Sequence, residues 1–252
     1  MQLYINTKPQ DEPKLNTKPL RLSHLAYQIG SDGHLRRAAG CAKLHGGLLS
    51  LNGIDHPAIQ DAPALAQEII RECITHRCEG VCADFGQNPT QDRVRLLQLL
   101  SQLLQRNSMA LFVSSAYGAY VDTATVLINT ALSGGTLSAM LRDAQETFGA
   151  SRIALDIERV TMDFTLPSYS GEGEPLTQEA LLQLQEIHKS SVFFSRELCA
   201  KYFTYQKEGQ SHFVLFDDAD TLRYKIALGS RMHISYGFLL YSEIADLPDV
   251  FQ

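Results

Sequence analysis

Short apolar segments that alternate with helical patterns constrain the fold of this chain more than any other feature. Each segment is bounded by turn signals and is typical of a buried β-strand. Eight such segments occur, at residues 3–6, 22–29, 46–51, 80–85, 110–115, 125–130, 153–160 and 236–241. Eight parallel strands with intervening helices close into a barrel of about 250 residues, and the chain has 252 residues. The sequence therefore predicts an α/β fold, a (β/α)8 TIM barrel.

One connection is too long for this alternation. Residues 163–217 contain their own helical pattern, "TQEALLQLQEIHKS", and a hairpin pattern, "KYFTYQKEGQSHFVLF", with Gly209 at the turn. A run of this length with its own elements indicates an inserted unit rather than a loop. We therefore predict a small α+β insertion between strands 7 and 8, with residues 1–162 and 218–252 forming the barrel.

Composition excludes several classes of partner. The net charge is −6 and the Lys and Arg residues are scattered, which argues against a nucleic-acid-binding surface. No apolar run approaches the roughly 20 residues that span a bilayer, so we expect no membrane partner. The first residues, "MQLYINTKPQ", lack a signal-peptide pattern, and the five cysteines are an odd number. Both features predict a cytoplasmic chain with reduced thiols.

The order of the segments resembles the chitinase-type glycoside hydrolases of family 18, especially the short form of bacterial spore-cortex and spore-coat proteins. "LSHLAYQI" and the following "DGHL" are similar to that family's "LTHINYAF" and "DGxL". "SRIALDIERVTMDFTLP" is similar to "KIVLGIPLYGRDWTLP". "FDDADTLRYKIALGSRMHISYGFLLYSEI" is similar to the family's "YDDxxSIxxKxxLxxxxGLGGVMFWEL". The resemblance covers nearly the whole chain and implies the same barrel with a chitinase-type insertion.

The family's signature strand, D-G-x-D-x-D-x-E, falls on "EGVCADFG", residues 79–86. In the family the last Glu is the general acid, and the substrate's own acetamido oxygen attacks the anomeric carbon. Asp84 keeps the position that orients this acetamido group, whereas Gly86 replaces the acid. Cys82 replaces the middle Asp, and Glu79 stands for the first. Strand alternation should direct residues 82, 84 and 86 into the barrel.

Other positions that the resemblance makes functional have also changed. The family's "MTYD" strand corresponds to residues 128–131, "INTA", which lack the Tyr and the Asp. The Trp that forms the floor of the family's pocket corresponds to Tyr241, and the chain contains no Trp. Tyr241 and Tyr117 are expected to offer weaker aromatic surfaces to a sugar ring. These losses together predict a pseudoenzyme.

Asp156 and Glu158 form a D-x-E pair on one face of the seventh strand, where the family has Gly and Pro. Alternation directs both acids into the barrel. One interpretation is a relocated acid, with Glu158 as the best candidate, or an oxygen-ligand metal site. The other is a structural pairing with Arg152 or Arg159, because a buried carboxylate without a partner is costly.

A cluster of cysteine and histidine residues raises the question of zinc. The residues are Cys73, His76, Cys78 and Cys82. Their spacing lacks a C-x2-C knuckle, and a helix-to-strand boundary divides them. Small buried cysteines are the commoner explanation. We therefore predict no metal and no cofactor.

Three functional hypotheses follow. The first is a non-catalytic, carbohydrate-binding or structural protein for an N-acetylhexosamine polysaccharide of a cell wall or spore cortex, with its ligand near Asp84, Tyr241, Asp156, Glu158, Tyr117 and Glu79. The second is an active glycosidase on an N-acetylglucosamine glycan that uses Glu158 as its acid. The third is a protein-assembly scaffold that binds no sugar. A spore association is an expectation from the resemblance, and the oligomeric state is left open.

Overall fold

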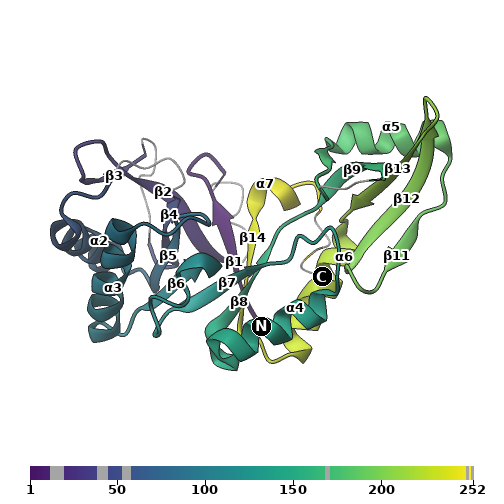
Figure 1. Cartoon of the computed structure of the whole chain (residues 1–252). Coiled ribbons are helices and arrows are strands. Elements are labelled where there is room, and N and C mark those ends of the chain that lie inside the picture. Colours follow the sequence, from purple (N-terminus) through teal and green to yellow (C-terminus); the bar gives the residue numbers. More distant parts are fainter. Residues whose placement is uncertain (12–19, 39–44, 53–57, 168–170, 248–249, 251–252) are drawn as a thin grey trace.

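The computed structural model describes residues 1–11, 20–38, 45–52, 58–167, 171–247 and 250 (Figure 1). Eight parallel strands form the closed part of its first, nine-stranded sheet, since the first strand pairs with both the second and the last. In barrel order the strands are β1 (Gln2–Thr7), β2 (Arg21–Ile29), β4 (Leu48–Asn52), β5 (Gly80–Asp84), β6 (Ala110–Ser114), β7 (Thr125–Asn129), β8 (Ile153–Ile157) and β14 (Tyr236–Leu240). A short strand, β3 (Leu35–Arg37), pairs antiparallel with β2. The predicted closed barrel is confirmed.

Alternation along the strands separates two apolar layers. On β5, Cys82 points into the barrel, where it belongs to a cluster with Phe112 and Phe238. Val81 and Ala83 belong to the larger cluster between the strands and the surrounding helices. The barrel interior is therefore packed rather than open, as small barrels require.

Helices cover the outside of the barrel where the sequence predicted them. They are α2 (Ala62–His76), α3 (Gln91–Arg106), α4 (Leu137–Phe148) and α6 (Ala219–Arg231). The Asp61 side chain accepts a hydrogen bond from the Ala64 N–H and so caps α2. The link from β6 to β7 is shorter and carries only a 3-10 turn, residues 115–117. A four-residue helix, α7 (Tyr241–Ile244), follows the last strand.

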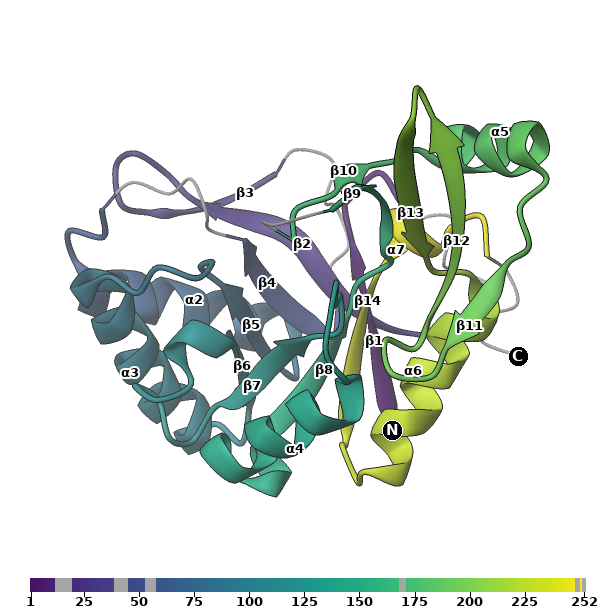
Figure 2. The same ribbon diagram turned by 45° about the vertical axis from the view of Figure 1, so that its right-hand side comes forward.

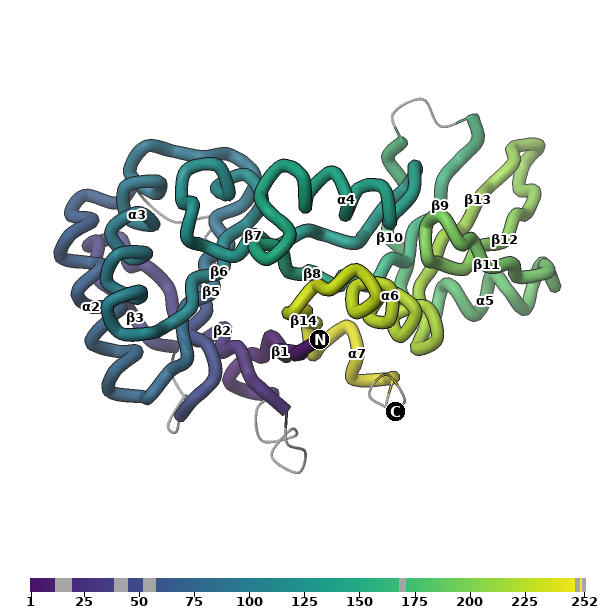
Figure 3. Tube along the Cα trace, turned by 90° about the horizontal axis from the view of Figure 1, so that it is seen from below, coloured from purple at the N-terminus to yellow at the C-terminus, as the bar shows by residue number. Residues whose placement is uncertain are grey.

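A second sheet of five antiparallel strands lies beside the barrel, at the opposite end of the molecule from α2 and α3 (Figures 1 and 3). Its order is β10 (Glu174–Pro175), β9 (Thr161–Leu166), β13 (Gln210–Phe216), β12 (Ala200–Lys207) and β11 (Phe193–Ser195). The helix α5 (Gln178–His188) packs along one face of this sheet (Figure 2). Gly209 has φ +79° between β12 and β13, so the predicted hairpin is confirmed. The division of the chain into a barrel and an insertion of residues 163–217 remains our proposal.

A buried ion pair joins the two sheets. Lys225 of α6 donates a hydrogen bond to the Asp217 carboxylate at 2.6 Å, and both side chains are fully buried. The same carboxylate accepts hydrogen bonds from the Thr221 hydroxyl and from the Val160 N–H, just before β9. Asp217 therefore fixes the start of the second sheet to a helix of the barrel.

Among the described helices, none has both the length and the apolar character needed to cross a membrane.

Candidate functional site

A pocket of about 190 Å³ opens at the carboxyl ends of the barrel strands, the end where TIM barrels carry their sites. We call it the barrel-mouth pocket. Its polar lining comes from Asn6, Ser50, Cys82, Asp84, Asp156, Glu158 and Glu243. The structure thus brings Asp84, Asp156 and Glu158 together, as alternation along β5 and β8 suggested. Glu243, from α7, was not identified from the sequence.

The end of β5 forms a tight turn at Gly86. Gly86 has φ +73°, and its N–H donates a hydrogen bond to the Asp84 carboxylate at 3.1 Å. The Ser114 hydroxyl donates to the Gly86 carbonyl oxygen at 3.1 Å. Asp84 is therefore held by its own strand end, while Gly86 supplies only backbone atoms to the site.

Asn129 binds both acids of the D-x-E pair. Its amide nitrogen donates to Glu158 at 2.6 Å and to Asp156 at 3.3 Å. Its amide oxygen accepts the Ala131 N–H at 2.7 Å, which sets the orientation of the amide. Asn129 lies opposite Asp156 in the register of β7 and β8. The pairing with Arg152 that the sequence left open is absent, because Arg152 donates to backbone carbonyls of the loop before β7 and of α4.

Burial raises the pKa of Asp156 to about 7, and the negative charges of Asp84, Glu158 and Glu243 add to the shift. The hydrogen bond from Asn129 acts in the opposite direction. Burial also raises the pKa of Glu243. At neutral pH the pocket therefore contains a carboxyl group that is near its midpoint of protonation.

Glu79 lies at the other end of the barrel, so the expectation that it lines the cleft is corrected. It precedes β5 and accepts hydrogen bonds from Arg21 at 2.6 Å and from the Tyr4 hydroxyl at 2.8 Å. The strand between Glu79 and Asp84 is five residues long, which places the two carboxylates at opposite openings of the barrel.

The two tyrosines selected from the sequence are not part of the pocket lining. Tyr117 is fully buried in the outer core, where its ring packs edge-on against Phe85. The aromatic surface expected from Tyr117 is therefore not accessible to a sugar. Tyr241 begins α7 and is partly buried against the outer core.

The cysteines and acids form no metal site among the described residues, where no group of three or more His, Cys, Asp or Glu side chains is placed to hold an ion. Cys73 and Cys78 are buried in the outer core, whereas Cys82 faces the barrel interior. Burial raises the pKa of the Cys82 thiol, which therefore stays protonated at neutral pH.

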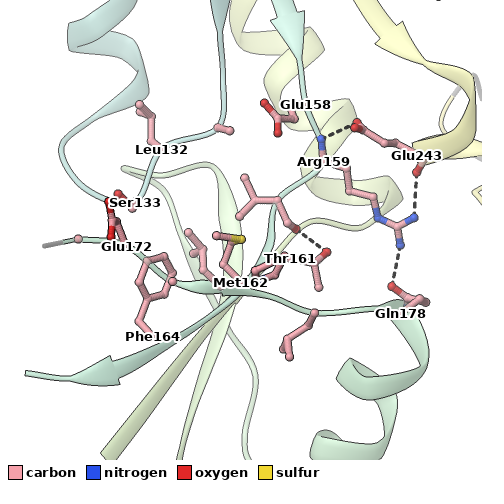
Figure 4. Close-up of a pocket in the computed structure, with 17 residues that line it drawn as sticks. Leu132, Ser133, Glu158, Arg159, Thr161, Met162, Phe164, Glu172, Gln178 and Glu243 are labelled. Atoms are coloured by element: carbon pink, nitrogen blue, oxygen red, sulfur yellow. Dashed lines mark hydrogen bonds between the residues drawn. The ribbon is translucent and has the colours of Figure 1, made fainter. Parts of the chain in front are cut away.

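A larger hollow of about 560 Å³ adjoins the barrel-mouth pocket and shares Glu158 and Glu243 with it (Figure 4). We call it the groove. It lies between the end of β8 and the second sheet, and Met162 and Phe164 form part of its apolar wall. Arg159 donates to Gln178 at 2.9 Å and to the Glu243 carbonyl at 2.9 Å, which ties α5 and α7 to this wall.

No protein-family model matches the sequence, and a search of curated proteins finds no significant match. Solved structures do match. The spore cortex-lytic enzyme SleL of Bacillus megaterium QM B1551 is 18% identical with a TM-score of 0.71, over 99% of this chain and 72% of that one. A glycoside hydrolase family 18 N-acetylglucosaminidase of Paenibacillus barengoltzii is 13% identical with a TM-score of 0.67, over 96% and 95%.

YKL-39, solved in the presence of chitooligosaccharides, is 10% identical with a TM-score of 0.70, over 99% of this chain and 97% of that one. At such identities the likeness concerns the fold. The closed eight-stranded parallel barrel and the proteins that share it lead to one conclusion. This chain has the fold of the chitinase-like proteins of glycoside hydrolase family 18.

Proposed function

We propose that this chain is a non-catalytic binding protein for polysaccharides that contain N-acetylhexosamine, such as those of a cell wall or a spore cortex. The observation that carries the proposal is Gly86 at the end of β5, in the position that the sequence resemblance assigns to the family's general acid. Glycine has no side chain that donates a proton. The loss of a general acid typically costs about 10²–10⁴-fold in rate.

The backbone at this position supports the same proposal. A residue with a side chain at φ near +73° is less stable by about 1–2 kcal/mol than in its usual conformation. The hydrogen bonds of Gly86 with Asp84 and Ser114 stabilise this turn. The strand end is thus built around glycine, which supports a non-catalytic role for this position.

The linings of the pocket and the groove support glycan binding. Sugar rings present hydroxyl and amide groups together with apolar C–H faces, and ligand pockets combine a few polar groups with apolar walls. The barrel-mouth pocket supplies Asp84 and Asn6, and the groove supplies Met162 and Phe164. The chitooligosaccharides present with YKL-39 and the cortex-lytic activity in the name of SleL support an aminosugar polymer as the ligand.

Binding without turnover tests the proposal. Calorimetric titration with N-acetylchitotetraose should show saturable binding, and chromatography of the same sample should show intact tetraose. Asp84→Ala should weaken binding by about 10- to 100-fold, the value of one hydrogen bond to a charged group. Glu79→Gln is the matched control, because Glu79 lies at the other opening of the barrel, and its affinity should equal that of the wild type. Shorter oligomers in the sample, or unchanged affinity in Asp84→Ala, would contradict the proposal.

A second function, hydrolysis of an N-acetylglucosamine glycan, is favoured by the protonation of Asp156 near neutral pH. A carboxyl group whose pKa is raised into this range is suited to act as a general acid. For this reason Asp156 is a better candidate for the general acid than Glu158, which the sequence had suggested for this role. Both side chains line the barrel-mouth pocket.

This second function predicts a specific pH profile. Turnover of a chromogenic N-acetylglucosamine oligomer should fall as the pH rises through about 7, where Asp156 loses its proton. Asp156→Asn should reduce the rate by about 10²–10⁴-fold, whereas Glu158→Gln should retain the descending limb of the profile. Wild-type protein without turnover between pH 5 and pH 8 would exclude hydrolysis and leave the binding function.

A further inference from the structure

Four aromatic side chains form a row across the second sheet, and the barrel-mouth site does not account for them. From the groove outward they are Phe164 of β9, Phe213 of β13, Tyr202 of β12 and Phe193 of β11. Successive ring centroids are 6.2, 5.2 and 5.7 Å apart. Phe164 is the cross-strand partner of Phe213, and Phe193 is that of Tyr202. We call this set the aromatic row.

The row lies on the face of the sheet that α5 leaves open. Leu181 of α5 packs on the other face, with Phe203 and Val214. The apolar cluster on the face of the row contains no helical residue among those described. At its outer end Phe193 is 55% exposed, so the row reaches solvent at the edge strand.

Charge is divided between the two faces of this sheet. Because side chains alternate along a strand, residues of one parity share a face. The positions between and beside the rings on the face of the row are Thr204, Gln206, Ser211 and other neutral residues, and the described strand residues of this face include no charged one. The charged residues of these strands, Asp163, Glu174, Lys201 and Lys207, are all on the α5 face. A face that is aromatic, neutral and exposed toward its outer edge matches a partner that is uncharged and amphipathic.

The row is continuous with the groove. Phe164, its innermost ring, lines the groove together with Met162 and Leu215 of the same face. A chain that leaves the groove along this face therefore meets Phe213, Tyr202 and Phe193 in order. The planes of the last three rings are inclined to each other by only 29° and 32°, so the rings pack against one another and form one continuous apolar strip.

We propose that the aromatic row binds the apolar C–H faces of successive pyranose rings in an uncharged, β-linked aminosugar chain that extends out of the groove. This inference rests on the proposed function and extends it to an outer binding surface on the second sheet. The neighbouring Gln206 and Ser211, which are hydrogen-bonded to each other at 2.7 Å, are placed to bind sugar hydroxyl or amide groups. The row thereby makes affinity depend on the length of the glycan.

Oligomers of two lengths test the row. In calorimetric titrations the wild type should bind N-acetylchitohexaose more tightly than N-acetylchitotriose, because the triose fits within the pocket and the groove. Phe193→Ala and Tyr202→Ala should each weaken hexaose binding by about 5-fold and leave triose binding unchanged. Phe194→Ala is the matched control, since Phe194 is the adjacent residue on the opposite face and is 40% exposed. Its affinities for both oligomers should equal those of the wild type.

The outcomes separate this inference from the function on which it rests. Equal affinity of the wild type for both oligomers, or hexaose binding that Phe193→Ala and Tyr202→Ala leave unchanged, overturns the role of the row alone. Binding of neither oligomer overturns the proposed function and this inference together. A wild-type dimer that Phe193→Ala dissociates, measured by light scattering, overturns the inference in favour of a second copy of the chain on this face.

Discussion

Lys225→Met should lower the free energy of unfolding by about 3–5 kcal/mol, the usual cost of leaving one member of a buried ion pair without its partner. Lys225 and Asp217 are both fully buried, and their charged atoms are 2.6 Å apart. Methionine fills a similar volume but leaves the Asp217 carboxylate as an uncompensated charge. Urea unfolding followed by circular dichroism at pH 7 measures the change.

Two further variants make this result interpretable. Asp217→Asn combined with Lys225→Met removes both charges and should recover much of the lost stability, since the cost comes from the unpaired charge. Lys201→Met is the matched control, because Lys201 pairs with Asp218 and Asp220 at the surface and such pairs contribute about 0–1 kcal/mol. A loss in Lys225→Met no greater than that in Lys201→Met would show that the buried pair does not hold the two sheets together.

Asp156→Asn should stabilise the protein at pH 8 by roughly 2–4 kcal/mol, from a shift of about three pKa units at 1.36 kcal/mol per unit. The pKa of Asp156 is about 7 in the folded protein and about 3.9 in an unfolded chain. Between these values the folded state holds a proton that the unfolded state has released, so stability falls as the pH rises. Asparagine does not ionise and removes this penalty.

The stabilisation by Asp156→Asn should increase as the pH rises. It should be small near pH 4, where Asp156 is protonated in the folded protein and still about half protonated in the unfolded chain, and should grow until the pH passes about 7. The exposed Asp122 serves as the control, and Asp122→Asn should leave stability unchanged at both pH values. Equal stability of Asp156→Asn and wild type at pH 8 would show that the pocket tolerates the charge. Carboxyl groups whose ionisation lowers the stability of the folded protein are typical of ligand sites.

The barrel was predictable because its signals are local. Each strand is a short apolar run between turn residues, and the alternation that directs Cys82 and Asp84 inward needs only the sequence of β5. The hairpin at Gly209 and the cap at Asp61 are equally local. Such signals survive in a chain that matches no family model, since they depend on residue type rather than on identity with relatives.

The site was predictable only in part, because its contacts join distant segments. The role of Asn129 depends on the register of β7 against β8, which no local pattern specifies. Glu243 enters the pocket from α7, 85 residues after Glu158 along the printed sequence. Tyr117 was misplaced for a similar reason: the turn after β6 directs its ring into the outer core. The position of Glu79 at the other opening could have been found by counting residues along β5.

The left-handed turn at Gly86 limits how a chain of this kind could gain a proton donor at the end of β5. Substitution of Gly86 by glutamate would first introduce backbone strain of about 1–2 kcal/mol. The new carboxyl group would not yet be positioned to donate a proton. Selection would therefore meet a loss of stability before any benefit, and a useful carboxyl group at this residue would need a second change that rebuilds the turn. A variant of this protein selected to cleave glycans would therefore more readily use a carboxyl group elsewhere in the pocket than one introduced at residue 86.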